Sequence, residues 1–326
     1  PYLWSGTMMQ FGGLAVMPFA LIIMTEPHSG PDLLGPFAAM AAFLLTGLGM
    51  HISQTAGLAL ATDLASEETR PRVVALLYLM LLIGMIGSAL IFAILLHDFN
   101  YIRLIQVIQG AAVVTIVLNV IAMWKQEARR PDLTSHTRFR PTFGVAWQAF
   151  LEIPKANRLL WALGLGTMGF AMQDILLEPY GAEVLGLSVS GTTLLTAMFA
   201  GGMIVALLLS SRTLGRGIDP IRVASSGILV GVGAFSAVIL SMPLDSVMLF
   251  QIGASLIGFG NGLFAVGMLS AAMVLGGANT AAGLTLGAWG AVQATAAGLA
   301  IFMGGAMRDS INSWAQTGVL GDAMQF

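Results

Sequence analysis

The sequence has no cysteine, and only 9% of its 326 residues carry a charge. Without cysteine, disulfides and thiolate metal sites are excluded. An average soluble domain is about 25% charged, whereas hydrophobic residues make up 57% of this chain. A soluble protein of this length could not bury that much apolar surface, so lipid must cover part of it. The net charge of −2 also gives no basic surface for nucleic acid.

The sequence also lacks the patterns that mark an enzyme or a secreted protein. It has no nucleophile–base set, no phosphate-binding loop and no metal-ligand cluster, so we expect a protein without catalytic activity. No basic segment precedes the first apolar run, which predicts no signal peptide. Because the first residue is Pro1, we expect it to lie within a longer chain.

Nine apolar runs are long enough to cross a bilayer, which takes about 20 residues. They cover residues 3–24, 37–60, 73–96, 103–124, 159–177, 192–211, 222–241, 247–275 and 281–305. Many of the 40 glycines lie within these runs, as the close packing of helices in lipid requires. The sequence therefore predicts an all-α polytopic membrane protein.

The distribution of lysine and arginine predicts the orientation in the membrane. Two of the 14 cations lie in loop 61–72, seven in segment 125–158 and three in loop 212–222. Each of these connections is separated from the next by two spans. The positive-inside rule therefore predicts that all three are cytoplasmic.

A weak internal repeat suggests the architecture. Residues 45–50 (LTGLGM) and 256–261 (LIGFGN) share the pattern L-x-G-x-G in the second and eighth spans. If these spans correspond, each half of the protein holds six helices, with two helices before Pro1 and one after Phe326. Two parallel six-helix halves form the major facilitator fold. The predicted division is residues 1–124 for the first half, 125–158 for the linker and 159–326 for the second half.

Loop 61–72 combines acids and bases between two long apolar runs. Asp63 and Glu67 precede Arg70 and Arg72, and pairs between them could lock the inner ends of the helices. Exposed ion pairs contribute only about 0–1 kcal/mol, so such a loop is better suited to switching than to stability. A plain positive-inside loop accounts for the same residues.

Loop 212–222 has the same two interpretations. Its glycines permit a tight turn, and Asp219 lies between Arg216 and Arg222. An aspartate in this position can bind a neighbouring helix end in one conformation and release it in another. The loop resembles the cytoplasmic loop of Gly and Asp/Arg in the second half of major facilitators, and it could equally be only a topogenic signal.

His51 and Gln54 are polar residues inside the second apolar run. Neutral imidazole could ligate a metal, or the magnesium of a chlorin, through one nitrogen. A packed histidine bonded to a neighbouring helix is the simpler interpretation. Gln54 follows at helical spacing on nearly the same face and could hydrogen-bond a carbonyl of a cargo molecule or another helix.

Gln173, Asp174 and Glu178 cluster at the outer end of the fifth run. The two carboxylates are four residues apart on one helical face, and their crowding favours protonation of one of them. This pattern is typical of a proton-coupling site. Pro179 is predicted to break the helix immediately afterwards, in which case both carboxylates lie at the wet membrane interface.

Several long strings resemble one family. They are QTAGLALATDLA (54–65), RPRVVALLYLMLL (70–82), RLIQVIQGAAVV (103–114), WKQEARRP (124–131), MQDILLEPYGAEVLGLSV (172–189) and GRGIDP (215–220). These strings resemble the PucC/LhaA family of phototrophic bacteria, a branch of the major facilitator superfamily also called the bacteriochlorophyll delivery family. The resemblance covers nearly the whole chain, and the opening residues resemble the third helix of that family.

The resemblance implies a non-enzymatic role in assembling the light-harvesting complexes LH1 or LH2. The implied cargo is bacteriochlorophyll, and the implied partners are antenna α and β polypeptides, the LH1–reaction centre complex and membrane lipids. His51 could supply an axial ligand to the pigment, although no family motif assigns it that role. Two other functions stay open: a secondary transporter of a small lipophile, coupled to protons through Asp174 or Glu178, and a passive scaffold subunit of a photosynthetic complex.

Overall fold

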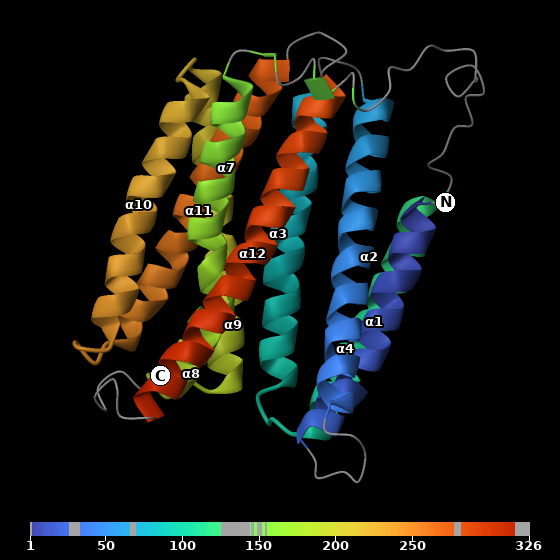
Figure 1. Ribbon diagram of the computed structural model, residues 1–326, viewed down its shortest axis with the longest axis vertical. Helices are drawn as coiled ribbons and strands as arrows, with labels where there is room; N and C mark the ends of the chain where they lie inside the picture. Colours follow the sequence, from blue (N-terminus) through green and yellow to red (C-terminus); the bar gives the residue numbers. More distant parts are fainter. Residues whose placement is uncertain are drawn as a thin grey trace. The chain divides into compact units, whose positions relative to one another are not determined.

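The computed structural model describes residues 2–25, 33–65, 70–124, 155–276 and 282–316, together with five single positions between 144 and 153. Every regular element in these segments is helical (Figure 1). The helices are α1 (Tyr2–Thr25), α2 (Leu34–Leu64), α3 (Arg70–Leu95), α4 (Tyr101–Met123), α7 (Ala156–Ala171), η1 (Met172–Ile175), α8 (Leu177–Glu183), α9 (Val189–Gly215), α10 (Pro220–Ser241), α11 (Val247–Gly276) and α12 (Ala282–Gln316).

Nine candidate membrane spans lie in the described residues, which confirms the predicted all-α polytopic fold. Each predicted run coincides with one span, although the ends differ. The last helix continues to Gln316, beyond its predicted end at residue 305. The twelve-helix major facilitator architecture stays a prediction.

The chain divides into two compact units. One consists of residues 1–81 and 94–138, and the other of residues 82–93 and 139–326. Residues 82–93 of α3 therefore group with the later part of the chain. The sequence instead predicted that the first half extends without a break to residue 124, the end of α4.

In the first unit, α1 packs against α2 and α4. The contact between α1 and α2 is close because small residues face each other. A Cβ atom at Gly13 would lie 2.6 Å from the carbonyl oxygen of Ala42, and one at Gly6 would lie 2.8 Å from that of Gly49. The hydroxyl of Thr46 donates to the same Ala42 carbonyl at 2.8 Å. This hydroxyl therefore needs no hydrogen-bond partner from another helix.

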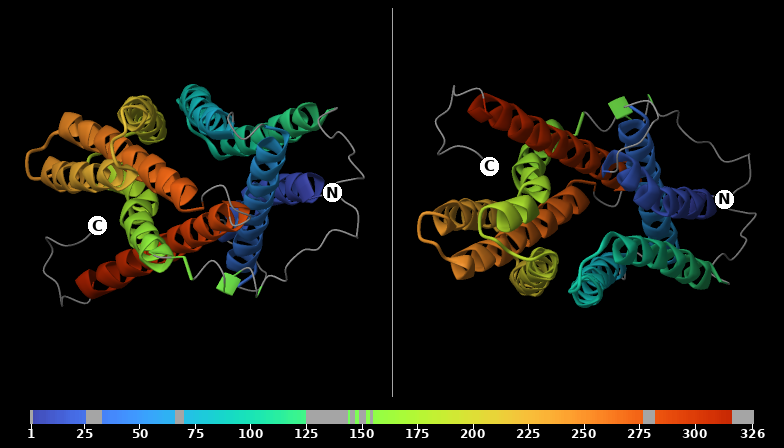
Figure 2. Two further views of the ribbon diagram at one scale, coloured as in Figure 1. Left: turned by 90° about the horizontal axis from the view of Figure 1, so that it is seen from above. Right: turned by 90° about the horizontal axis from the view of Figure 1, so that it is seen from below.

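In the second unit, α11 is the central helix. It packs against α9, α10, α12 and α7, and Figures 1 and 2 show α10 and α11 side by side. Buried residues make up 56% of the membrane-spanning part of α11, against at most 28% for any other span of the described chain. Its glycines allow this burial: a Cβ at Gly260 would lie 2.8 Å from the carbonyl oxygen of Gly227 in α10.

The fifth span is interrupted rather than continuous. After α7 the backbone forms the 3₁₀ turn η1, in which Leu176 N–H donates to the carbonyl of Gln173 at 3.0 Å. The helix then resumes as α8, with Pro179 in its first turn. Proline is tolerated there because the N–H groups of a first helical turn have no intrahelical partner. The prediction that Pro179 ends the helix was therefore wrong: the break precedes the proline, and the span continues to Glu183.

The close contact between α9 and α11 supports a prediction about glycine. A methyl group at Gly258 would overlap the carbonyl oxygen of Phe199 in α9, and backbone cannot yield as a side chain can. We expect Gly258→Ala to destabilise the protein by about 1–3 kcal/mol, the usual cost of overpacking. The measurement is the apparent melting temperature in mild detergent, followed by size-exclusion chromatography.

The matched control is Gly233→Ala in α10, where the added methyl group would meet nothing within 4 Å. This change should leave the melting temperature unchanged or raise it, because alanine favours helix by up to about 1 kcal/mol over glycine. Equal melting temperatures for the two variants would contradict the close α9–α11 contact.

Candidate functional site

The first unit contains a cavity of about 580 Å³, which lies in the size range of small-molecule sites. Helices α1, α2, α3 and α4 all contribute to it. The lining residues are Leu3, Ser53, Gln54, Gly57, Leu58, Leu60, Ala61, Leu64, Leu77, Tyr78, Leu81, Asn119, Ala122 and Met123.

Four uncharged polar side chains project from these otherwise apolar walls. Ser53 and Gln54 come from α2, Tyr78 from α3 and Asn119 from α4. Tyr78 and Asn119 are half-buried. The hydroxyl oxygen of Ser53 is buried and has no hydrogen-bond partner among the described residues. An unsatisfied buried polar atom costs about 1–3 kcal/mol; this oxygen lies against Gly6 in the contact between α1 and α2.

The chemistry of the cavity follows from its composition. The amides of Gln54 and Asn119 and the hydroxyl of Tyr78 offer both donors and acceptors, and none of the lining side chains that the structure describes is charged. Such a site suits a largely apolar, neutral molecule with a few carbonyl or hydroxyl groups.

Gln54 lines this cavity and His51 does not, and a hydrogen bond from Gln54 to a cargo molecule or to another helix stays a prediction. His51 is one turn closer to the N-terminus of α2, and its side chain is exposed on the helix. Tyr78 and Asn119 were missed by the sequence analysis. Both are polar residues inside long apolar runs (VVALLYLM and TIVLNVIAM), and that signal could have identified them.

The break in the fifth span divides the three polar residues at its predicted outer end: Gln173 and Asp174 lie in η1, and Glu178 lies in α8. Gln173, in η1, is buried and donates from its side-chain nitrogen to Oδ1 of Asp174, while its own side-chain oxygen has no partner among the described residues. Oε1 of Glu178, in α8, accepts from the hydroxyl of Thr196 in α9 at 3.0 Å. Both carboxylate residues are exposed. The geometry is compatible with an interfacial position as well as with proton coupling, so both interpretations stay open.

The turn between α9 and α10 is shorter than the predicted loop, because it consists only of residues 216–219. Gly217 adopts a left-handed conformation with φ 80°, which glycine accepts without strain. Asp219 is the N-cap of α10, since its Oδ1 accepts from the N–H of Ile221 at 2.7 Å. Arg216 and Arg222 are exposed, and neither forms an ion pair with Asp219 in this part of the chain.

The other predicted gating residues fall at the edge of the described structure. Glu67 lies outside the described residues, and Asp63, Arg70 and Arg72 are described only in their backbone. The backbone places Asp63 in the last turn of α2, and both arginines in the first turn of α3. The connection is therefore shorter than predicted, and the predicted ion pairs stay a prediction.

Taken together, these findings define a polytopic helical membrane protein with a cavity of small-molecule size in its first unit. The family described as "PUCC protein" matches residues 1–326. The chain belongs to this family.

Individual relatives include one that carries the family's name. The chain is 50% identical to "Protein PucC" of Rhodovulum sulfidophilum over 95% of its own length and 70% of the relative. It is 52% identical to an "Uncharacterized protein in puhA-bchM intergenic region" of Rhodobacter capsulatus, over 98% of this chain and 68% of that protein. A "Bacteriochlorophyll synthase 44.5 kDa chain" of the same species is 28% identical over 82% of this chain and 63% of its own length.

The N-cap role of Asp219 leads to a prediction that distinguishes the capping hydrogen bond from the negative charge of this side chain. Asn caps helices about as well as Asp, whereas Ala does not. We expect Asp219→Ala to destabilise the protein by about 1 kcal/mol and Asp219→Asn to leave its melting temperature unchanged. The measurement is thermal unfolding of both variants in the same detergent.

The same pair of variants tests the gating hypothesis. If Asp219 acts only as a cap, Asp219→Asn should support wild-type antenna levels in phototrophic cells. A normal melting temperature combined with a loss of antenna would show that the charge of Asp219, and not its cap, is needed.

Proposed function

We propose that this protein is a non-enzymatic assembly factor for the light-harvesting complexes of phototrophic bacteria. It would hold bacteriochlorophyll while antenna α and β polypeptides are inserted in the inner membrane, with its three cation-rich connections in the cytoplasm. Membership of the PucC family supports this proposal, and so does the multi-pass helical fold.

The observation that carries the proposal is the apolar cavity with its four uncharged polar side chains. Bacteriochlorophyll is a neutral, largely apolar macrocycle with several carbonyl groups at its edge. Gln54, Tyr78 and Asn119 would donate hydrogen bonds to such carbonyls, and the leucines of α2 and α3 would cover the ring. The long hydrocarbon tail would stay in lipid, so the cavity has to hold only the macrocycle.

This recognition needs no histidine ligand to magnesium. His51 does not line the cavity, and hydrogen bonds to carbonyl groups suit a carrier that has to release its cargo. Each such bond contributes only about 0.5–1.5 kcal/mol, so the pigment would be held in place and still transferred.

One observation favours a second candidate function. The fifth span is interrupted at Gln173 and Asp174, and interrupted helices with ionisable groups mark the substrate and ion sites of many secondary transporters. A transporter of a small lipophile would therefore use Asp174 or Glu178 for proton coupling.

The test is antenna assembly in a phototrophic host whose own copy of the gene is deleted. We expect the double variant Gln54→Leu/Asn119→Leu to lower antenna absorption roughly tenfold, since it removes two hydrogen bonds to the pigment. The pigment should still be synthesised. The readouts are near-infrared absorption of the membranes and mass spectrometry of the antenna polypeptides that copurify.

Gln106→Leu is the matched control, because Gln106 is an exposed glutamine of α4 that does not line the cavity. It should support wild-type assembly. Normal antenna levels in the double variant would contradict the proposed pigment site. Loss of antenna in Asp174→Asn/Glu178→Gln, with normal levels in the cavity variant, would favour the transporter.

A further inference from the structure

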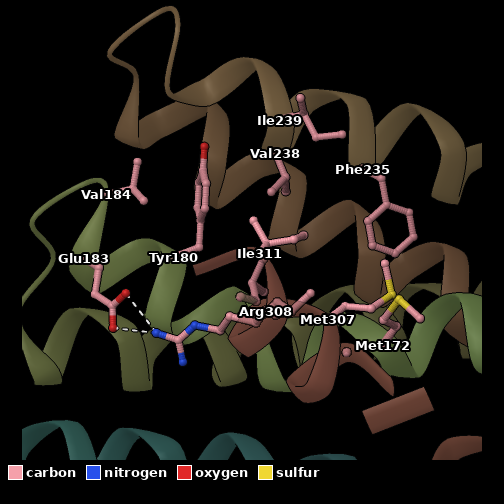
Figure 3. Close-up of a pocket in the computed structure, with 13 residues that line it drawn as sticks. Met172, Tyr180, Glu183, Val184, Phe235, Val238, Ile239, Met307, Arg308 and Ile311 are labelled. Carbon is pink, nitrogen blue, oxygen red and sulfur yellow. Dashed lines mark hydrogen bonds and ion pairs between the residues drawn. The ribbon is translucent and has the colours of Figure 1, made fainter. Parts of the chain in front are cut away.

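A second cavity, of about 320 Å³, lies in the other unit among η1, α8, α10 and α12 (Figure 3). Apolar side chains form nearly all of its wall. The lining residues are Met172, Leu176, Leu177, Tyr180, Glu183, Val184, Phe235, Val238, Ile239, Gly304, Met307, Arg308 and Ile311.

This cavity opens toward the surface that lipid covers. At its floor Leu177 is buried, with 8% of its surface exposed, whereas Ile239 and Met307 on the rim are 69% and 52% exposed. Tyr180 is held in the wall by a ring contact with Phe250, at 5.7 Å between ring centroids. The pocket is therefore preformed by packing and accessible from the hydrocarbon side.

The two charged residues lie together at one end of the pocket. Nη2 of Arg308 donates to both carboxylate oxygens of Glu183, at 2.7 and 2.9 Å. Figure 3 shows this pair on one side and Phe235, Met172 and Met307 on the other. The pocket thus has an apolar end and a polar end, and this arrangement is complementary to an amphiphilic molecule.

The ion pair also determines which kind of polar group a bound molecule can place at this end of the pocket. Glu183 already balances the charge of Arg308, so a second full anion would compete with that carboxylate. A guanidinium carries five N–H donors, and the bonds to Glu183 use only Nη2. The donors on Nη1 and Nε can therefore serve a neutral acceptor, and an ester carbonyl is such a group.

The position along the helices agrees with an ester. The pocket lies near the ends of α8, α10 and α12, where the cation distribution predicts the outer leaflet. Trp314 follows Arg308 on α12 and is 55% exposed, and tryptophan is enriched at the level of lipid headgroups. Ester groups of glycerolipids occupy the same depth, between the headgroups and the hydrocarbon.

We propose that this pocket binds one acyl chain of a diacyl glycerophospholipid, whose ester carbonyl accepts a hydrogen bond from Arg308. A water molecule takes about 30 Å³ of liquid, and a methylene group is of similar size, so the pocket accommodates on the order of ten methylene groups. The surrounding bilayer supplies this ligand at high concentration. The site is independent of the pigment cavity, which lies in the other unit.

The test compares two lipids that differ only in the carbonyl. The full chain, purified in mild detergent, is titrated with dioleoyl phosphatidylcholine and with its dialkyl ether analogue, and bound lipid is counted by native mass spectrometry. We expect the ether lipid to bind about tenfold more weakly, because it lacks the carbonyl and its ether oxygen accepts a hydrogen bond from a charged donor less strongly. In Glu183→Gln/Arg308→Met, which removes both charges together, the two lipids should bind equally.

A pair of tryptophan variants tests the position of the chain. Val238→Trp fills the pocket from α10, whereas Leu240→Trp places the same side chain on an exposed position of the same helix outside the lining. We expect Val238→Trp to lose the retained lipid and Leu240→Trp to keep it. Equal binding of ester and ether lipids to the wild type would overturn the proposal, even if Val238→Trp failed to fold. So would a polypeptide retained at this pocket in place of lipid.

Discussion

Close backbone contact between helices is the constraint on which the rest of this structure depends. Lipid removes the hydrophobic driving force between helices, so packing relies on small residues that let backbones approach. Gly227 and Gly260 provide such a contact between α10 and α11, and Gly258 provides another against α9. Because these contacts fix the helices, the positions at which side chains leave space between them are fixed as well.

Helix α2 shows how one element combines packing and recognition. Its small residues at Ala42, Thr46 and Gly49 hold α1 at close distance, while Ser53 and Gln54, further along the helix, line the cavity. Ser53 belongs to this close contact, since a Cβ at Gly6 would lie 2.9 Å from its backbone nitrogen, and Gln54 is the next residue of the helix. A set of weak hydrogen bonds can then still be selective, because the side chains lose little further conformational freedom when the ligand binds.

The sequence predicted the spans well because an apolar run of about 20 residues is rarely anything but a membrane-spanning helix. It predicted their ends poorly: charged residues such as Arg70 continue into α3, and Pro179 is accommodated inside a first turn. At the candidate site, Gln54 was identified from its depth in an apolar run. Tyr78 and Asn119 were missed because their role depends on α2, α3 and α4 lining one cavity, and the order of residues along one chain does not record which helices share a cavity.

The central claim is that the cavity of the first unit recognises pigment through its carbonyl groups rather than through magnesium. The most direct measurement is a titration of the purified protein with bacteriochlorophyll and with its magnesium-free form, followed by absorption and by the carbonyl stretching frequencies in resonance Raman spectra. We expect similar affinities for the two pigments and a lowered carbonyl frequency in both. Binding of the magnesium form alone, with unshifted carbonyl frequencies, would contradict it.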